Sequence, residues 1–343
     1  MTAMQYIVRH KILIFALLTA LLTDVGLLVF LIPDGIGADF LAFWRAANSP
    51  EPYAFSATPF ANPPTALLWL QALRILPFWP TFALFTFGGI FAFAWFARNL
   101  YGRTAALLGL ISPAAILAAV PGQLSIIEAA LIFAAFASCP IACGVLLAVA
   151  ASIKPQMVLL APIALDGSRG WRSCLAFVLA GLFLAIIATG LLGPAIWSDW
   201  IRGVQMLVAA AGERHALLLA VSPLSFAGSV NGIVIAGFLI VALLCVTGVY
   251  SFRKSPPQEQ AAAVVAFSLL ASPYALSYDI VALAPFAAAV ILRDRSWRGL
   301  LGAVTYTAAL GPLSLISAIL SSYRGVRGAP LIERQRSAGR EFG

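Results

Sequence analysis

The sequence predicts an all-α polytopic membrane protein, a bundle of roughly 10 to 12 transmembrane or re-entrant helices with an outward-facing vestibule. Three observations lead to this fold class. Of the 343 residues, 62% are hydrophobic and only 10% are charged, which excludes a soluble enzyme. Runs of about twenty residues without a charge recur along the chain. The alternating pattern of a membrane β-barrel is absent, so helices must satisfy the backbone.

The first apolar segment, residues 12–33, follows the basic residues Arg9, His10 and Lys11. It lacks a small-residue cleavage site, so we interpret it as an uncleaved anchor that leaves the N-terminus in the cytoplasm. The later charge-free runs predict further spans at residues 75–97, 104–127, 129–153, 173–198, 216–252, 261–278 and 300–323.

The charges between these runs predict the topology. Basic turns at residues 98–103, 169–172, 253–254 and 293–298 belong in the cytoplasm by the positive-inside rule. Residues 34–62, with three acidic side chains against Arg45, form the first outer loop, and the neutral residues 199–214 also lie outside. The net charge of +8 therefore reflects topology and not nucleic-acid binding.

Two segments are too short to cross the membrane. With a cytoplasmic end near Pro140, the ascent to Lys154 and Pro155 covers about 20 Å of a hydrocarbon core about 30 Å thick. A similar break follows Ser272 and leads to Tyr278 and Asp279. Irregular backbone at this depth is tolerated where it lines a cavity, which predicts a recessed polar vestibule under the outer loops.

The last run breaks at Gly311 and Pro312. A re-entrant pair there would return the arginines of the tail to the cytoplasm, as the positive-inside rule prefers. We therefore expect one integral membrane domain over residues 1–323 and a basic tail over 324–343.

Charged groups beside membrane spans are functional candidates. Lys154, at the apex of a break, suits the phosphate of a lipid headgroup, and a lysine that snorkels to the interface is the alternative. Asp24 is either functional or a bundle-facing carboxyl, and Glu128 is either functional or a carboxylate that is favoured at the start of a helix. The four cysteines have no spacing that suggests zinc and are expected to be packing residues.

The first outer loop predicts an interfacial helix, since Asp39, Phe43 and Ala46 follow helical spacing. Asp39, near its start, is a candidate base or only a helix cap. Further on, Pro63 and Pro64 are expected to stop any helix and to hold an extended segment.

In their order along the chain, these features resemble glycosyltransferase family 87, within the membrane-embedded GT-C superfamily. The resemblance rests on Asp39, Phe43, Trp44, Ala46, Ala47, Tyr53, Pro63, Pro64, Gly122, Gln123, Lys154, Pro155, Gln156, Trp171, Arg172, Ser272, Pro273, Tyr278 and Asp279. It implies a GT-C-like bundle that transfers a hexose, commonly mannose, from a polyprenyl-phosphate donor to a lipid or glycan acceptor outside the membrane. It also implies that Asp39 is the general base.

The reaction would be a direct inverting displacement. Lys154 and Arg45 are expected to stabilise the leaving phosphate. Trp44, Tyr53 and Tyr278 either stack on sugars or belong to the interfacial aromatic belt. The remaining substrate or vestibule candidates are Asn62, Gln123, Gln156 and Asp279.

With two histidines and no carboxylate cluster, no metal or other cofactor is expected. The chain is shorter than many relatives and lacks their Asn-Ser feature between residues 199 and 225. His215 either takes over a role there or is a solvent-exposed histidine. The expected partners are membrane lipid, the polyprenyl-linked sugar and the acceptor. A flippase for a lipid-linked sugar, or a scaffold of an envelope-glycan pathway, would be alternative functions.

Overall fold

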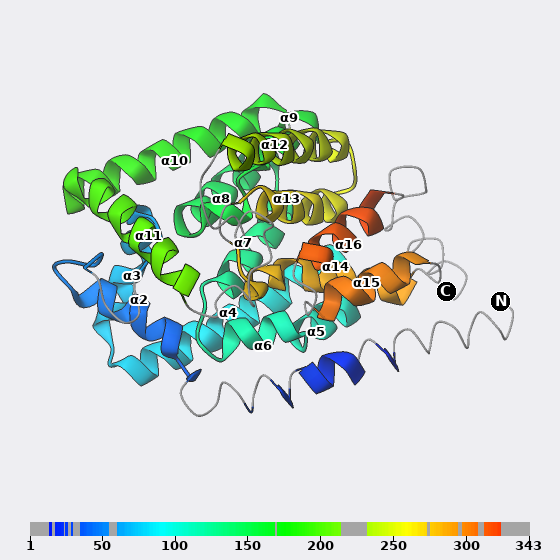
Figure 1. Ribbon diagram of the computed structural model, residues 1–343, viewed down its shortest axis with the longest axis horizontal. Helices are drawn as coiled ribbons and strands as arrows, with labels where there is room; N and C mark the ends of the chain where they lie inside the picture. The colour runs from blue at the N-terminus through cyan, green and yellow to red at the C-terminus, as the bar shows by residue number, and fades with distance from the viewer. Residues whose placement is uncertain are drawn as a thin grey trace, which may run out of the picture.

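The computed structural model describes residues 35–54, 60–168, 170–213, 232–272, 275–293, 297–307 and 312–323, with short stretches between 14 and 29 (Figure 1). Within these residues the chain is helical and contains no strand. The first half holds α2 (Ala38–Asn48), α3 (Pro64–Leu70), η1 (Gln71–Ile75), α4 (Phe78–Tyr101), α5 (Arg103–Leu110), α6 (Pro113–Ala119), α7 (Ser125–Ala137) and α8 (Pro140–Ile153). The second half holds η2 (Pro155–Met157), α9 (Ala161–Ser168), α10 (Trp171–Leu192), α11 (Ala195–Glu213), α12 (Gly232–Phe252), α13 (Pro257–Ala271), η5 (Ser277–Leu283), α14 (Ala284–Arg293), α15 (Trp297–Thr307) and α16 (Pro312–Tyr323).

Helices α4 and α10 are long and apolar enough to cross a membrane. Their large apolar side chains face outward, for example Phe87 at 70% exposure on α4 and Ile186 at 69% on α10. Such continuous apolar faces are rare on proteins that are surrounded by water. They suggest a membrane protein, in agreement with the composition.

The predicted breaks are confirmed. α8 ends at Ile153 and is followed by the short η2 and α9, and α13 ends at Ala271 before η5 and α14. The last apolar run is divided into α15 and α16, and α16 begins at Pro312. The predicted helix of the first loop is α2, with Phe43 and Ala46 buried.

Two predicted spans were wrong in their extent. Residues 104–127 form α5, α6 and the start of α7, because Ser112 accepts a hydrogen bond from the Ala115 amide and starts a new helix with Pro113 in its first turn. Residues 173–198 belong to α10 and α11, which are separated at Gly193 and Pro194, and α11 continues as helix through the expected loop to Glu213.

The proline pair of the first loop also differs from expectation. Pro63 is extended, as predicted, but Pro64 begins α3 instead of preventing a helix. Proline is favoured at the first helical position, where its missing N–H has no intrahelical partner to lose.

The core lies around α7 and α13. α7 packs against α4, α8 and η5, and every residue of α13 from Gln258 to Ala271 is buried. α8 also packs tightly on α10, since a Cβ on Gly144 would lie 2.2 Å from the Ser173 carbonyl oxygen. These central contacts bring the broken ends of α8 and α13 together near the first loop.

Several predictions fall outside the described residues. These are the candidates Asp24 and His215, the basic turn at Arg9 to Lys11, and the tail over residues 324–343.

Candidate active site

Helix α2 begins against the loop that precedes α7. The amides of Asp39 and Phe40 donate to the Pro121 carbonyl at 3.0 and 2.9 Å, and the Gly37 amide donates to Val120 at 2.9 Å. These contacts satisfy amides that have no partner within a helix's first turn. Gly37, not Asp39, occupies the N-cap position of α2. The capping alternative for Asp39 was therefore wrong.

Gly122 turns the loop so that Gln123 faces Asp39. Its φ of +79° favours glycine, and a Cβ there would lie 2.7 Å from Phe40 Cβ and 2.8 Å from the Phe82 ring. The backbone amide of Gln123 donates to the Ala118 carbonyl at 2.7 Å, and the side-chain Nε2 of Gln123 donates to Asp39 Oδ2 at 2.6 Å. The glycine thus allows the close approach that orients the carboxylate.

Gly122→Ala should destabilise the protein by about 1–3 kcal/mol, because the methyl group meets both α2 and α4 and the backbone is strained. Thermal unfolding in detergent measures this change. Gly181→Ala is the matched control, since a Cβ there meets nothing within 4 Å on helix α10. Equal unfolding temperatures for the two variants would contradict the close approach.

The end of α8 is held by side chains of the first loop and α3. Asn62 Nδ2 donates to the Ile153 carbonyl at 2.9 Å, and Thr65 Oγ1 donates to the Ser152 carbonyl at 2.7 Å. Trp69 Nε1 donates to Ser152 Oγ at 2.8 Å. The last carbonyls of a helix have no intrahelical partner, so these side chains stabilise the break before Lys154.

Lys154 lies buried at this break. Its Nζ donates to Ser125 Oγ at 2.8 Å, Asp279 Oδ1 at 2.9 Å and Gln123 Oε1 at 3.3 Å. It also lies 4.5 Å from the centre of the Tyr278 ring, over its face. All three protons of the ammonium therefore have acceptors.

Asp279 is fully buried at the start of η5. Besides Lys154, its carboxylate accepts from Ser125 Oγ at 2.7 Å and from the Leu276 amide at 3.1 Å. A buried ion pair is tolerated only when further hydrogen bonds satisfy both partners, as they do here. The carboxylate at position 279 is thus bound to groups within the protein.

The result is a continuous chain of polar side chains, hereafter the polar chain: Asp39, Gln123, Lys154 and Asp279. Burial raises the pKa of the Asp39 carboxyl, while the Gln123 hydrogen bond and the positive charge of Lys154 act in the opposite direction. A carboxyl whose pKa is raised is a better proton acceptor once it is ionised. This arrangement suits a base and a cation that act on two ends of one reaction.

Two polar residues near this chain have no role in the predicted site. Ser125 was not predicted at all, and Glu128 was a candidate without an assigned role. Ser125 bridges Lys154 and Asp279, and only its position just after Gln123 could have pointed to it. Glu128, one helical turn further along α7, is fully buried, and both its carboxyl oxygens lack a hydrogen-bond partner in the described chain.

Four other predicted site residues, Tyr53, Asn62, Trp44 and Gln156, are not part of the polar chain. Tyr53 is buried and donates its hydroxyl to the Asn62 carbonyl at 2.8 Å, and Asn62 holds the end of α8. Trp44 packs edge-on against Phe78. Gln156 is half-buried in η2, two residues after Lys154. Asn62 therefore supports the break before Lys154, and Tyr53 in turn contacts Asn62.

Arg45, the other residue expected at the donor phosphate, lies apart from the polar chain. It is exposed on α2, and at about 100° per residue it points about 240° round the helix from Asp39. Among the described residues, Lys154 is the basic side chain that belongs to the polar chain.

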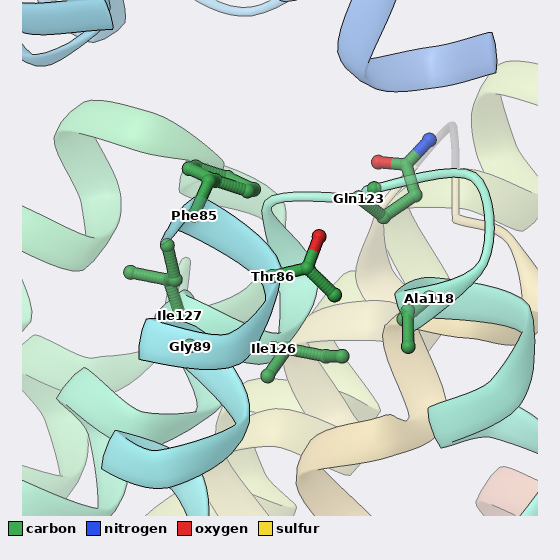
Figure 2. A pocket seen from close by; sticks show the side chains of 9 residues that line it. Phe85, Thr86, Gly89, Ala118, Gln123, Ile126 and Ile127 are labelled. Carbon is green, nitrogen blue, oxygen red and sulfur yellow. The ribbon is translucent and has the colours of Figure 1, made fainter. Parts of the chain in front are cut away.

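A small cavity of about 10 Å³ lies beside the site, between α4 and the loop that carries Gln123. Figure 2 shows Thr86 of α4 facing this loop, with Phe85, Ile126 and Ile127 among the lining side chains. This volume holds about one water molecule, so the cavity is too small for a sugar.

Comparison with known families gives one match. Residues 60–273 match the model of glycosyltransferase family 87. The chain belongs to glycosyltransferase family 87. No curated protein and no solved structure gives a significant match.

Membership in glycosyltransferase family 87 confirms the resemblance seen in the sequence, and it indicates that the chain is a glycosyltransferase. The matched residues include Gln123, Ser125 and Lys154. Asp39 precedes the matched segment and Asp279 follows it, so their place in the site rests on their contacts with these three residues.

Proposed function

We propose that the protein transfers a hexose, with mannose the first candidate, from a polyprenyl-phosphate donor to a lipid or glycan acceptor at the outer face of the membrane. The observation that carries the proposal is the polar chain in which one amide, Gln123, contacts both the Asp39 carboxylate and the Lys154 ammonium. The family supplies the reaction class, and the chain supplies a base and a cation for it.

In this proposal Asp39 accepts the proton of an acceptor hydroxyl while that oxygen forms a bond to the anomeric carbon. The bond from this carbon to the phosphate oxygen breaks, and the electron pair leaves with the phosphate. The negative charge that grows on the phosphate is stabilised by Lys154 more in the transition state than in the ground state. One carboxylate and one leaving group suffice for this inverting displacement.

Lys154 must exchange a partner to receive a phosphate, because its three protons are already donated. Gln123 Oε1 is the longest of these contacts, at 3.3 Å, whereas Ser125 and Asp279 are at 2.8 and 2.9 Å. The phosphate would replace the Gln123 carbonyl, and Asp279 would remain to hold the lysine in position. Gln123 would keep its other contact, to Asp39.

Comparison of cells with and without the gene tests this function. Mass spectrometry of glycolipids and envelope glycans should show a product that has lost one hexose when the gene is absent. Unchanged glycans would contradict the proposal. Accumulation of an intact lipid-linked sugar on the cytoplasmic leaflet would favour the flippase.

We further propose that the protein is a multi-pass protein of the cell membrane, with residues 34–62 on the outer side. Chemical labelling at position 49 tests this topology. Ser49 is exposed at the end of α2. In a background that retains no other cysteine, Ser49→Cys should react with an impermeant maleimide in intact spheroplasts.

Cys139 provides the matched control for this topology. It is exposed next to Pro140, where the proposal places the cytoplasmic side. A chain that retains only Cys139 should react after lysis and not before. The opposite labelling order would reverse the topology and move Asp39 to the cytoplasmic side.

A further inference from the structure

A second cavity, outside the polar chain, lies between residues 50–54 of the first loop and helix α11. Its volume is about 590 Å³, within the range of about 300–1,000 Å³ typical of ligand pockets. Figure 1 shows α11 on the same side of the molecule as α2 and α3, and α11 contacts α3.

Both walls of this cavity are anchored. Trp200 Nε1 of α11 donates to the Ala61 carbonyl at 2.9 Å. Gly203 faces Tyr53, and a Cβ on it would lie 3.6 Å from the tyrosine ring. The cavity is therefore held between two fixed elements.

Both walls of the cavity, residues 50–54 and helix α11, contribute polar and apolar side chains. Glu51, Asp199, Arg202 and Gln205 supply hydrogen-bonding groups, and Tyr53 with Met206 supplies apolar surface. Asp199 and Arg202 form an ion pair on successive turns of α11. Two carboxylates against one guanidinium leave a formal charge of −1, which disfavours a phosphate and suits a neutral ligand with many hydroxyl groups.

The cavity is connected to the polar chain by hydrogen bonds. Tyr53, in its wall, donates its hydroxyl to the Asn62 carbonyl, and the Asn62 amide donates to the Ile153 carbonyl, next to Lys154. A ligand in the cavity would thus lie beside the loop that supports the site, and Lys154 is not among the residues that line the cavity.

We infer that this cavity binds the neutral sugar portion of the acceptor, separate from the phosphate of the donor. This inference rests on the proposed function for its meaning, but its test is a binding measurement. Glu51 and Gln205 would accept and donate hydrogen bonds to sugar hydroxyls, and Met206 would pack against the ring.

The test uses the full-length protein in detergent and a panel of methyl hexosides, with saturation-transfer NMR as the readout. At least one hexoside should bind to the wild-type chain. Gln205→Leu, which keeps the size but loses the polar groups, should weaken binding about five- to tenfold. Met206→Phe, which fills the cavity, should weaken it at least as much.

Ile201→Phe is the matched control, because Ile201 is 52% exposed on the same helix and does not line the cavity. It should bind as the wild type does, and inorganic phosphate should not displace the hexoside. Absence of binding by every hexoside, equal binding by the Met206 and Ile201 variants, or displacement by phosphate would overturn the inference. Hexoside binding without any sugar transfer would contradict the proposed function alone.

Discussion

Asp39→Asn should lower the rate of sugar transfer by about 10² to 10⁴, the contribution expected of a general base. Asparagine is nearly the same size and keeps an oxygen that can accept the hydrogen bond from Gln123 Nε2. It cannot accept the proton of the acceptor hydroxyl at neutral pH. The measurement is transfer from a polyprenyl-phosphate hexose in proteoliposomes, with thermal unfolding of both proteins alongside.

Asp39→Glu is the control for this substitution, since it keeps a carboxylate and should retain part of the activity. A stable Asp39→Asn protein with wild-type transfer would remove Asp39 as the base. Asp279 would then be a poor replacement, because its carboxylate is buried and bound to Lys154, Ser125 and the Leu276 amide.

The pH dependence gives an independent check on Asp39. Burial raises the pKa of its carboxyl, so a base at this position becomes protonated at a higher pH than an exposed aspartate would. On acidification, kcat/KM should therefore fall from a pH above the usual range of aspartate. Asp39→Asn should lack this fall.

Lys154→Met should destabilise the protein by about 3–5 kcal/mol, because it leaves the buried Asp279 carboxylate without its cation. Loss of transfer in this variant alone would not separate binding from folding. The double variant Lys154→Met with Asp279→Asn removes both charges, and asparagine can still contact Ser125 and the Leu276 amide. It should recover most of the stability and none of the transfer.

Thermal unfolding and transfer assays on the two single variants and the double variant form a complete cycle. Wild-type transfer in the double variant would rule out a role for Lys154 with the donor. A Lys154→Met protein as stable as the wild type would contradict the buried ion pair.

Local chemistry made much of the fold predictable. Prolines 155 and 312 mark breaks because proline cannot continue the helix that precedes it, and charge-free runs revealed most of the helices. The break at Ser112 and Pro113 was missed because the run from residue 104 to 127 contains no charged residue and was interpreted as one span. The mean hydropathy of a run indicates whether it is buried in lipid or protein, and one capping serine hardly changes that mean.

The sequence predicted which residues belong to the site better than it predicted which of them contact one another. Asp39, Gln123, Lys154 and Asp279 each stood out as polar groups beside apolar runs. Their pairing was not predicted, since 125 residues separate Lys154 from Asp279 and no local pattern encodes that contact. Arg45 was assigned to the phosphate because it is a cation near Asp39 in sequence, but helical geometry turns it away.

The long sequence separations within the site also impose an order on its assembly. When Ile153 is synthesised, its partner Asn62 is already present, 91 residues earlier in the chain. The carboxylate partner of Lys154, Asp279, is synthesised only 125 residues later. During that interval the ammonium must stay in contact with water or headgroups, since burying it without Asp279 is costly. The first loop can therefore close over Lys154 only after η5 has been made, so the last third of the chain controls when the site becomes enclosed.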